Sequence, residues 1–264
     1  MNKNNIHKEN QKEEMSLLAV YAHPDDESFV PGGTIARYAF EGIKVTLVCA
    51  TRGEEGMLGD PPLADRTSIG KCREEELLGS CRVLGVDRIC FLDLIDSRLS
   101  TYPHPDVEGK IVEIIRTVKP QVVITFGSEG ITGHPDHTAI SHFTTDAFFD
   151  AGQPDKYSEL KEFGLETYQP AKLYFSVLPK NMAESLSVKL EGVEDNQITA
   201  VIDVSRYAHI KKEALFCHRT QLSDFRKYNE EDFNKILSKE YFSLIYSNLS
   251  CQKRGEDDLF EYLR

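Results

Sequence analysis

The sequence predicts an α/β fold in which helices cover both faces of a mostly parallel sheet. Short, uninterrupted apolar runs at residues 17–21, 45–51 and 121–127 indicate strands that are buried on both faces. Segments with helical spacing of apolar residues separate these runs, and this alternation is typical of parallel α/β proteins. Two polar segments rich in His and Asp directly follow the strand-like runs that end at residues 21 and 127.

The first half of the chain alternates strand and helix regularly. Strands are expected at residues 17–21, 45–51, 88–94 and 121–127. Helices are expected at residues 34–40, 64–84 and 107–118, with a further helix opened by Pro135. Gly42 and Gly85 follow the first two helices, as glycine commonly does at a helix C-terminus. Pro135 fits the first turn of a helix because its missing N–H has no helical partner there.

The second half is less regular. Strands are expected at residues 172–179 and 198–204, and helices near residues 207–218 and 232–246. Residues 1–15 are polar and are expected to form a disordered lead-in without the apolar core of a signal peptide. Residues 16–264 are expected to form a single domain, and no run approaches the roughly 18 apolar residues of a membrane span.

Composition narrows the class of protein. Lys and Arg number 31 against 43 Asp and Glu, which gives a formal net charge of −12. Nucleic-acid and anionic-membrane surfaces require clustered positive charge, so the composition argues against both partners. The six cysteines lack a CxxC pair and indicate reduced thiols in a cytoplasmic protein. The oligomeric state stays open, a homo-oligomer included.

The motifs AHPDDE at 22–27 and GHPDH at 133–137 carry the chemistry. Each follows a predicted strand, and parallel strands gather their carboxyl ends along one edge of a sheet, where ligands bind. His23, Asp26 and His137 would then supply two imidazoles and one carboxylate to a metal ion. This ligand set suits one catalytic Zn²⁺ per chain, with Fe²⁺ as an alternative.

The neighbouring side chains have the chemistry of a hydrolytic site. Asp25 is next to Asp26 in the chain, but its side chain is expected to point in a different direction. It could therefore act as a general base on water. His134 lies one helical turn from His137 and could donate a hydrogen bond to a developing oxyanion. Asp136 could hydrogen-bond a nearby imidazole and fix its tautomer.

Simpler interpretations of these motifs exist. HPDD could be an ordinary helix start, with Asp as the cap and Pro in the first turn. The alternation of strands and helices alone also fits a nucleotide-binding module. However, the first strand is followed by HPDDESFVPGG and not by a glycine-rich phosphate loop. A non-catalytic relic would have lost a ligand or Asp25, and none is missing. The occurrence of two such motifs, each after an apolar strand, favours a metal-dependent hydrolase.

Taken together, these motifs resemble the LmbE-like (PIG-L) N-acetylglucosaminyl deacetylase family. TRGEEG at 51–56, DSRL at 96–99 and KKEALFCHRTQ at 211–221 extend the resemblance in the right order. It implies a Rossmann-like three-layer fold and a mononuclear zinc hydrolase. The expected reaction removes acetate from an N-acetylglucosamine-type sugar or sugar conjugate. The resemblance assigns the metal to His23, Asp26 and His137 and the general base to Asp25.

The resemblance also points to substrate-binding residues. Family members contact substrate at the positions of Glu54, Arg73 and Asp96. A fourth candidate, His218, matches a C-terminal histidine of the family. Arg73 could instead pair with Glu76 on the same helix surface. An amidase that cuts a larger amide conjugate or an acylated metabolite would use the same catalytic residues, so the sequence leaves that alternative open.

Overall fold

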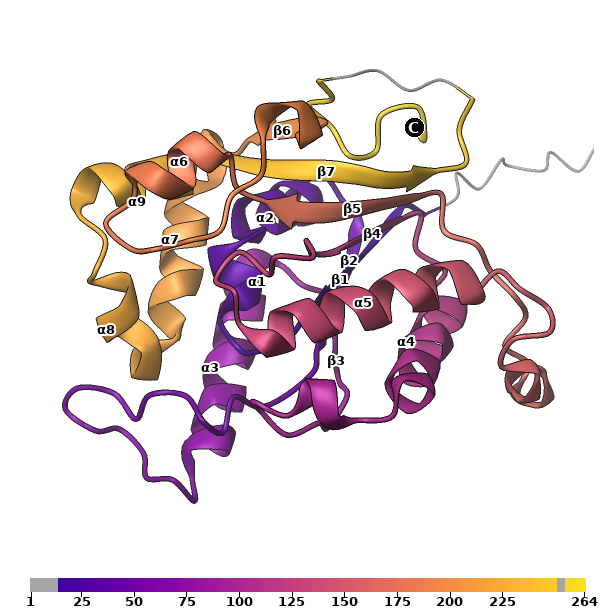
Figure 1. The fold of residues 1–264 in the computed structure, drawn as a ribbon, viewed down its shortest axis with the longest axis horizontal. Coiled ribbons are helices and arrows are strands. Elements are labelled where there is room, and N and C mark those ends of the chain that lie inside the picture. The colour runs from indigo at the N-terminus through magenta and orange to yellow at the C-terminus, as the bar shows by residue number, and fades with distance from the viewer. Residues whose placement is uncertain (1–13, 251–254) are drawn as a thin grey trace, which may run out of the picture.

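Seven strands form one sheet in the computed structural model, which describes residues 14–250 and 255–264 (Figure 1). The strands are β1 (Ser16–Tyr21), β2 (Lys44–Cys49), β3 (Arg88–Phe91), β4 (Val122–Phe126), β5 (Lys172–Val177), β6 (Ala200–Asp203) and β7 (Lys239–Ser247). Their order across the sheet is β3-β2-β1-β4-β5-β7-β6. The first five strands pair in parallel, and β7 pairs antiparallel with both β5 and β6. The predicted α/β fold with a mostly parallel sheet is confirmed.

Helices cover both faces of the sheet. They are α1 (Asp26–Phe29), α2 (Gly32–Phe40), α3 (Ile69–Leu84), α4 (His104–Val118), α5 (Pro135–Asp150), α6 (Lys180–Ser185), α7 (Ala208–Cys217), α8 (Leu222–Phe225) and α9 (Glu230–Ser238). Helices α2, α3 and α7 pack together in one layer, and α4 packs with α5 in the other. No helix in the described part of the chain is long and apolar enough to cross a membrane.

The strand order changes direction at β1. From β1 the chain moves outward to β2 and β3, and then returns to place β4 on the other side of β1. In open α/β sheets the crevice beside such a point, at the carboxyl ends of the strands, is the usual ligand site. AHPDDE follows β1, and GHPDH spans the start of α5, the helix that follows β4, so both motifs lie at this crevice.

The predicted helix at residues 232–246 is wrong in its second half. Helix α9 ends at Ser238, and β7 begins at the next residue and runs between β5 and β6. Aromatic residues such as Tyr241, Phe242 and Tyr246 suit a pleated surface better than a helix. Glu240 is buried within this strand.

Helix α3 also begins later than predicted, at Ile69 instead of residue 64. The Asp65 carboxylate accepts hydrogen bonds from the backbone N–H groups of Thr67 and Ser68, both at 2.9 Å. These local bonds give the backbone an alternative to helix before Ser68. The predicted lead-in falls mainly outside the described residues, and the single-domain assignment stays a prediction.

A buried carboxylate attaches β7 to the helical layer. The Glu240 side chain accepts hydrogen bonds from the backbone N–H groups of Gly33 at 2.8 Å and Thr34 at 2.7 Å. It also forms an ion pair with the buried Lys211 of α7, with 2.6 Å between Nζ and Oε1. The Glu240–Lys211 ion pair therefore joins β7 to α7 and to the first turn of α2.

We predict that Glu240→Gln lowers the free energy of unfolding by about 3 kcal/mol, because it leaves the buried Lys211 ammonium without its counter-charge. Urea unfolding followed by circular dichroism measures the change. The matched control is Glu231→Gln in α9, whose pair with Lys235 is exposed and should contribute less than about 1 kcal/mol. An equally small change in both variants would show that the Glu240 charge does not hold these elements together.

Candidate active site

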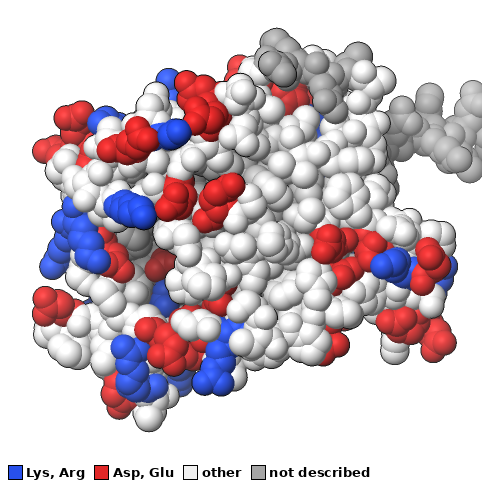
Figure 2. Space-filling model, viewed as in Figure 1, with Lys and Arg blue, Asp and Glu red and all other residues white. Residues whose placement is uncertain are grey.

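A cavity of about 390 Å³ lies at the carboxyl ends of β1 and β4. Figure 2 shows this face of the molecule hollowed on its left side, with charged side chains around the opening. The lining includes most of the residues that the two motifs single out. Those residues are His23, Asp25, Asp26, His134 and His137.

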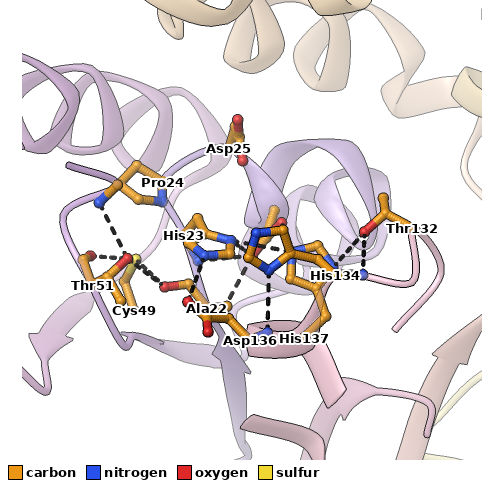
Figure 3. Close-up of polar contacts among 12 residues, drawn as sticks. Ala22, His23, Pro24, Asp25, Cys49, Thr51, Thr132, His134, Asp136 and His137 are labelled. Carbon is orange, nitrogen blue, oxygen red and sulfur yellow. Dashed lines mark hydrogen bonds and ion pairs between the residues drawn. The ribbon is translucent and has the colours of Figure 1, made fainter. Parts of the chain in front are cut away.

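Three side chains from the two motifs meet at the floor of this cavity, and Figure 3 shows two of them, His23 and His137, beside each other. The distance between His23 Nδ1 and His137 Nε2 is 3.1 Å. Asp26 completes the group, with Oδ1 3.3 Å from His137 Nε2 and Oδ2 3.7 Å from His23 Nδ1. All three residues are buried. The residues that the sequence assigns to a metal therefore lie together.

The hydrogen bonds around the two imidazoles fix which nitrogens carry protons. His137 Nδ1 lies 2.8 Å from the carbonyl oxygen of Gly130, which can only accept, so Nε2 keeps its lone pair. His23 Nε2 lies 3.1 Å from Asp96 Oδ1 and 3.3 Å from Asp136 Oδ2, so it donates and leaves the lone pair on Nδ1. When the His23 ring is neutral, two lone pairs and a carboxylate therefore converge on one point, and this donor set suits a divalent metal.

The electrostatics of the cluster favour a positive charge. In the metal-free protein, burial alone would lower the pKa of His23, but its hydrogen bonds to Asp136 and Asp96 raise the pKa to about 10. Without a metal, His23 Nδ1 therefore carries a proton, and a bound cation would replace it. Burial and the His23 charge lower the pKa of His137 to about 4, so this ring is neutral. Ligand atoms of His23, His134 and His137 also lie within 4.8 Å of one another, as do those of His23, Asp96 and Asp136. The described residues therefore fit a metal ion.

Asp25 is held in an unusual backbone conformation beside the cluster. Its φ of 119° and ψ of −28° lie where non-glycine residues are strained. The Asp25 N–H donates to Glu27 Oε2 at 2.9 Å. Arg73 Nη2 donates to Asp25 Oδ2 at 3.1 Å and to the carbonyl oxygen of Pro24 at 2.6 Å. Burial, partly offset by Arg73, raises the pKa of Asp25 to about 6.

A buried network behind Asp25 was missed by the sequence analysis. His218 Nε2 donates to Glu27 Oε1 at 2.7 Å, and Ser80 Oγ donates to the same oxygen at 2.5 Å. Glu27 is thereby fixed while its other oxygen holds the Asp25 backbone. The signal in the sequence was the glutamate that ends AHPDDE, for which no role was expected. His218 is completely buried and does not line the cavity.

The second motif orients its side chains by helix capping. His134 caps α5, with Nδ1 accepting a hydrogen bond from the Asp136 N–H at 3.2 Å. The proton of the neutral His134 ring therefore lies on Nε2. The Asp136 carboxylate accepts hydrogen bonds from the N–H groups of Ser97 at 2.7 Å and Leu99 at 3.0 Å, and it contacts His23. Asp136 thus lies outside the cavity and within 3.3 Å of His23 Nε2, and its role in fixing the His23 tautomer stays a prediction.

The expected substrate residues divide into two groups. Arg73 and Asp96 line the cavity, whereas Glu54 and His218 do not. Glu54 Oε2 accepts a hydrogen bond from the Asp96 N–H at 3.3 Å, so it supports the loop behind the cavity. Arg73 does not pair with Glu76. The Glu76 carboxylate instead accepts two hydrogen bonds from Thr220. The substrate roles stay predictions.

Comparison with known proteins identifies the family. The profile described as "PIG-L: GlcNAc-PI de-N-acetylase" matches residues 18–148. The 1D-myo-inositol 2-acetamido-2-deoxy-alpha-D-glucopyranoside deacetylase of Thermobifida fusca is 35% identical over 290 residues, which cover 92% of this chain and 98% of the relative. The chain belongs to the PIG-L family. The resemblance predicted from the motifs is confirmed.

Solved structures of the same fold differ in their reactions. N,N'-diacetylchitobiose deacetylase from Pyrococcus horikoshii has a TM-score of 0.68 at 20% identity and matches 89% of this chain and 85% of its own. GalB, the 4-carboxy-2-hydroxymuconate hydratase of Pseudomonas putida KT2440, has a TM-score of 0.67 at 19% identity and matches 90% of this chain and 99% of its own. At these identities the likeness shows the fold alone. The reaction has to be argued from the side chains of this chain.

We predict that Asp25→Asn stabilises the metal-free protein at pH 8 by about 1 kcal/mol. The Asp25 carboxyl has an ordinary pKa of 3.8 and a folded-state pKa of about 6, so above pH 6 the fold must hold a charge that burial disfavours. The gain should shrink at pH 5, where the folded carboxyl is mostly protonated. Urea unfolding at both pH values, with a chelator present, measures it.

Asp65→Asn is the matched control for this prediction. Hydrogen bonds from Thr67 and Ser68 lower the pKa of Asp65 to about 2, so its charge stabilises the fold and the substitution should give no gain. An Asp25→Asn gain that is the same at pH 5 and pH 8 would contradict the assigned cause.

Proposed function

We propose that this chain is a metal-dependent N-deacetylase that hydrolyses the acetamide of an N-acetylglucosamine-type sugar conjugate. The observation that carries the proposal is the convergence of His23 Nδ1, His137 Nε2 and the Asp26 carboxylate at the floor of one cavity, beside Asp25 and His134. The named relatives support the same class, because the Thermobifida fusca protein is named as a deacetylase of a 2-acetamido sugar joined to inositol.

His23, Asp26 and His137 would hold the metal, for which we propose Zn²⁺, with Fe²⁺ as the alternative. When bound there, a divalent cation supplies Lewis-acid chemistry that polarises a carbonyl and lowers the pKa of water. Asp136 and Asp96 keep the His23 lone pair directed at this point by accepting from the opposite nitrogen.

The remaining steps are proton transfers by residues of the cavity. Asp25 would take the proton of the attacking water, and a carboxyl whose pKa burial raises to about 6 is suited to a base near neutral pH. His134 would donate from Nε2 to the acetamide oxygen as negative charge develops on it. Cleavage of the C–N bond then gives acetate, and the proton held by Asp25 leaves with the amine.

The test is primary-amine release from a panel of N-acetylglucosamine compounds by the zinc-reconstituted enzyme, with Asp25→Asn as the blank. Wild-type enzyme should release amine and acetate in equal amounts. Asp25→Asn should keep its zinc and lose activity by about 10²- to 10⁴-fold, the usual contribution of a general base.

The outcomes separate the parts of the proposal. A wild-type rate in Asp25→Asn would show that another group is the base. No release from any compound, with one zinc bound per chain, would contradict the sugar substrate and favour an amidase that acts on a larger amide conjugate.

A further inference from the structure

The cavity has an apolar part that the proposed chemistry does not use. Besides the polar floor, the lining includes side chains that contribute mainly apolar surface. They are Phe29, Val188, Leu190, Phe225 and Tyr228. All of these except Phe29 lie beyond residue 148, where the match to the PIG-L profile ends. The apolar part is therefore contributed mainly by segments outside the catalytic motifs.

Three of these side chains form a contiguous aromatic surface, here called the aromatic wall: Phe29, Phe225 and Tyr228. The rings of Phe29 and Phe225 are nearly parallel, with centroids 6.1 Å apart and planes at 13°. The centroids of Phe29 and Tyr228 are 5.7 Å apart. All three residues are half-buried, so they pack on one another and still present surface to the cavity.

The aromatic wall is held in place at both ends. Phe29 ends α1, three residues after the expected ligand Asp26. Phe225 ends α8, and the residue before α8, Gln221, is bound at both its amide oxygen and nitrogen to the backbone of Met57, at 3.2 and 2.9 Å. A surface held in this way loses little conformational entropy when a ligand binds.

The chemistry of the wall indicates what it contacts. Sugar hydroxyls and the acetamide are polar and match the charged floor, where Asp25, Arg73 and Asp96 lie. Aromatic faces instead gain free energy by covering a flat apolar surface. The cavity volume of about 390 Å³ lies in the range of sites that hold a drug-sized ligand. There is thus room for a second ring beside the amino sugar.

We propose that the aromatic wall is an aglycone subsite, which binds an apolar ring attached to the N-acetylated sugar. This inference rests on the proposed function, since it assigns the floor to the acetamide and the sugar. It makes Phe225 and Tyr228 specificity-determining residues that select among glycosides without taking part in the cleavage step. The substrate class is then an amino-sugar glycoside with a ring-shaped, largely apolar aglycone.

The test compares the phenyl and methyl glycosides of N-acetylglucosamine with zinc-reconstituted enzyme. Wild type should show a kcat/KM about tenfold higher for the phenyl glycoside, and Phe225→Ala and Tyr228→Ala should each remove most of that ratio. Phe225→Leu, which keeps an apolar side chain, should restore part of it. The control is Phe216→Ala, because this exposed aromatic lies on α7 and does not line the cavity.

Two results would overturn the subsite. One is equal kcat/KM for both glycosides in wild type. The other is a phenyl preference that survives in both alanine variants. If the variants instead change the preference between N-acetyl and N-butanoyl groups on one glycoside, the wall binds the acyl chain and the aglycone assignment is wrong.

Binding measurements distinguish this inference from the proposed function. Calorimetric titration of the phenyl glycoside into zinc-loaded Asp25→Asn, with and without Phe225→Ala, reports the subsite without any cleavage. Binding that weakens about tenfold with Phe225→Ala supports the subsite even if wild type releases no amine, and that second result would contradict only the deacetylase reaction. Binding of equal strength in both variants would contradict the subsite.

Discussion

The parallel pairing of β1 with β4 is the constraint on which the rest of the structure depends. The pairing aligns Leu17 with Val122 and brings the ends of the two strands together. It thereby brings together His23 and His137, which are 114 residues apart in the chain, so that His23 Nδ1 lies 3.1 Å from His137 Nε2. Neither motif has a complete donor set alone. The site exists because the chain returns to place β4 beside β1 after building β2 and β3 on its other side.

Burial then decides the chemistry of the joined motifs. His23 lies among carboxylates in a part of the protein from which water is largely excluded, so a cation at its Nδ1 is strongly favoured. The same burial raises the pKa of Asp25, while the Glu27 carboxylate holds the Asp25 backbone in a strained conformation. Strain of this kind persists only where surrounding contacts impose it. The Glu27–His218 pair supplies those contacts from the interior, away from the cavity.

The sequence predicted the parallel half of the sheet well, because strands buried on both faces are continuously apolar. It also predicted which motif residues come together. It failed at β7, where a helix was expected. The buried Glu240 of this strand pairs with Lys211 of α7, and such a tertiary contact cannot be read from the local sequence. The roles of Glu27 and of the aromatic wall were equally hidden. They depend on long-range contacts with His218, directly after α7, and with α8, and no local pattern encodes these contacts.

The central claim is that His23 Nδ1, the Asp26 carboxylate and His137 Nε2 together hold the metal. The most direct measurement is the anomalous-scattering map of zinc-soaked crystals, collected at the zinc absorption edge. We predict a single strong peak between these three groups at the floor of the cavity. A peak instead beside His23 Nε2, between Asp96 and Asp136, would contradict the assignment, because those two carboxylates would then be ligands and not the groups that orient His23.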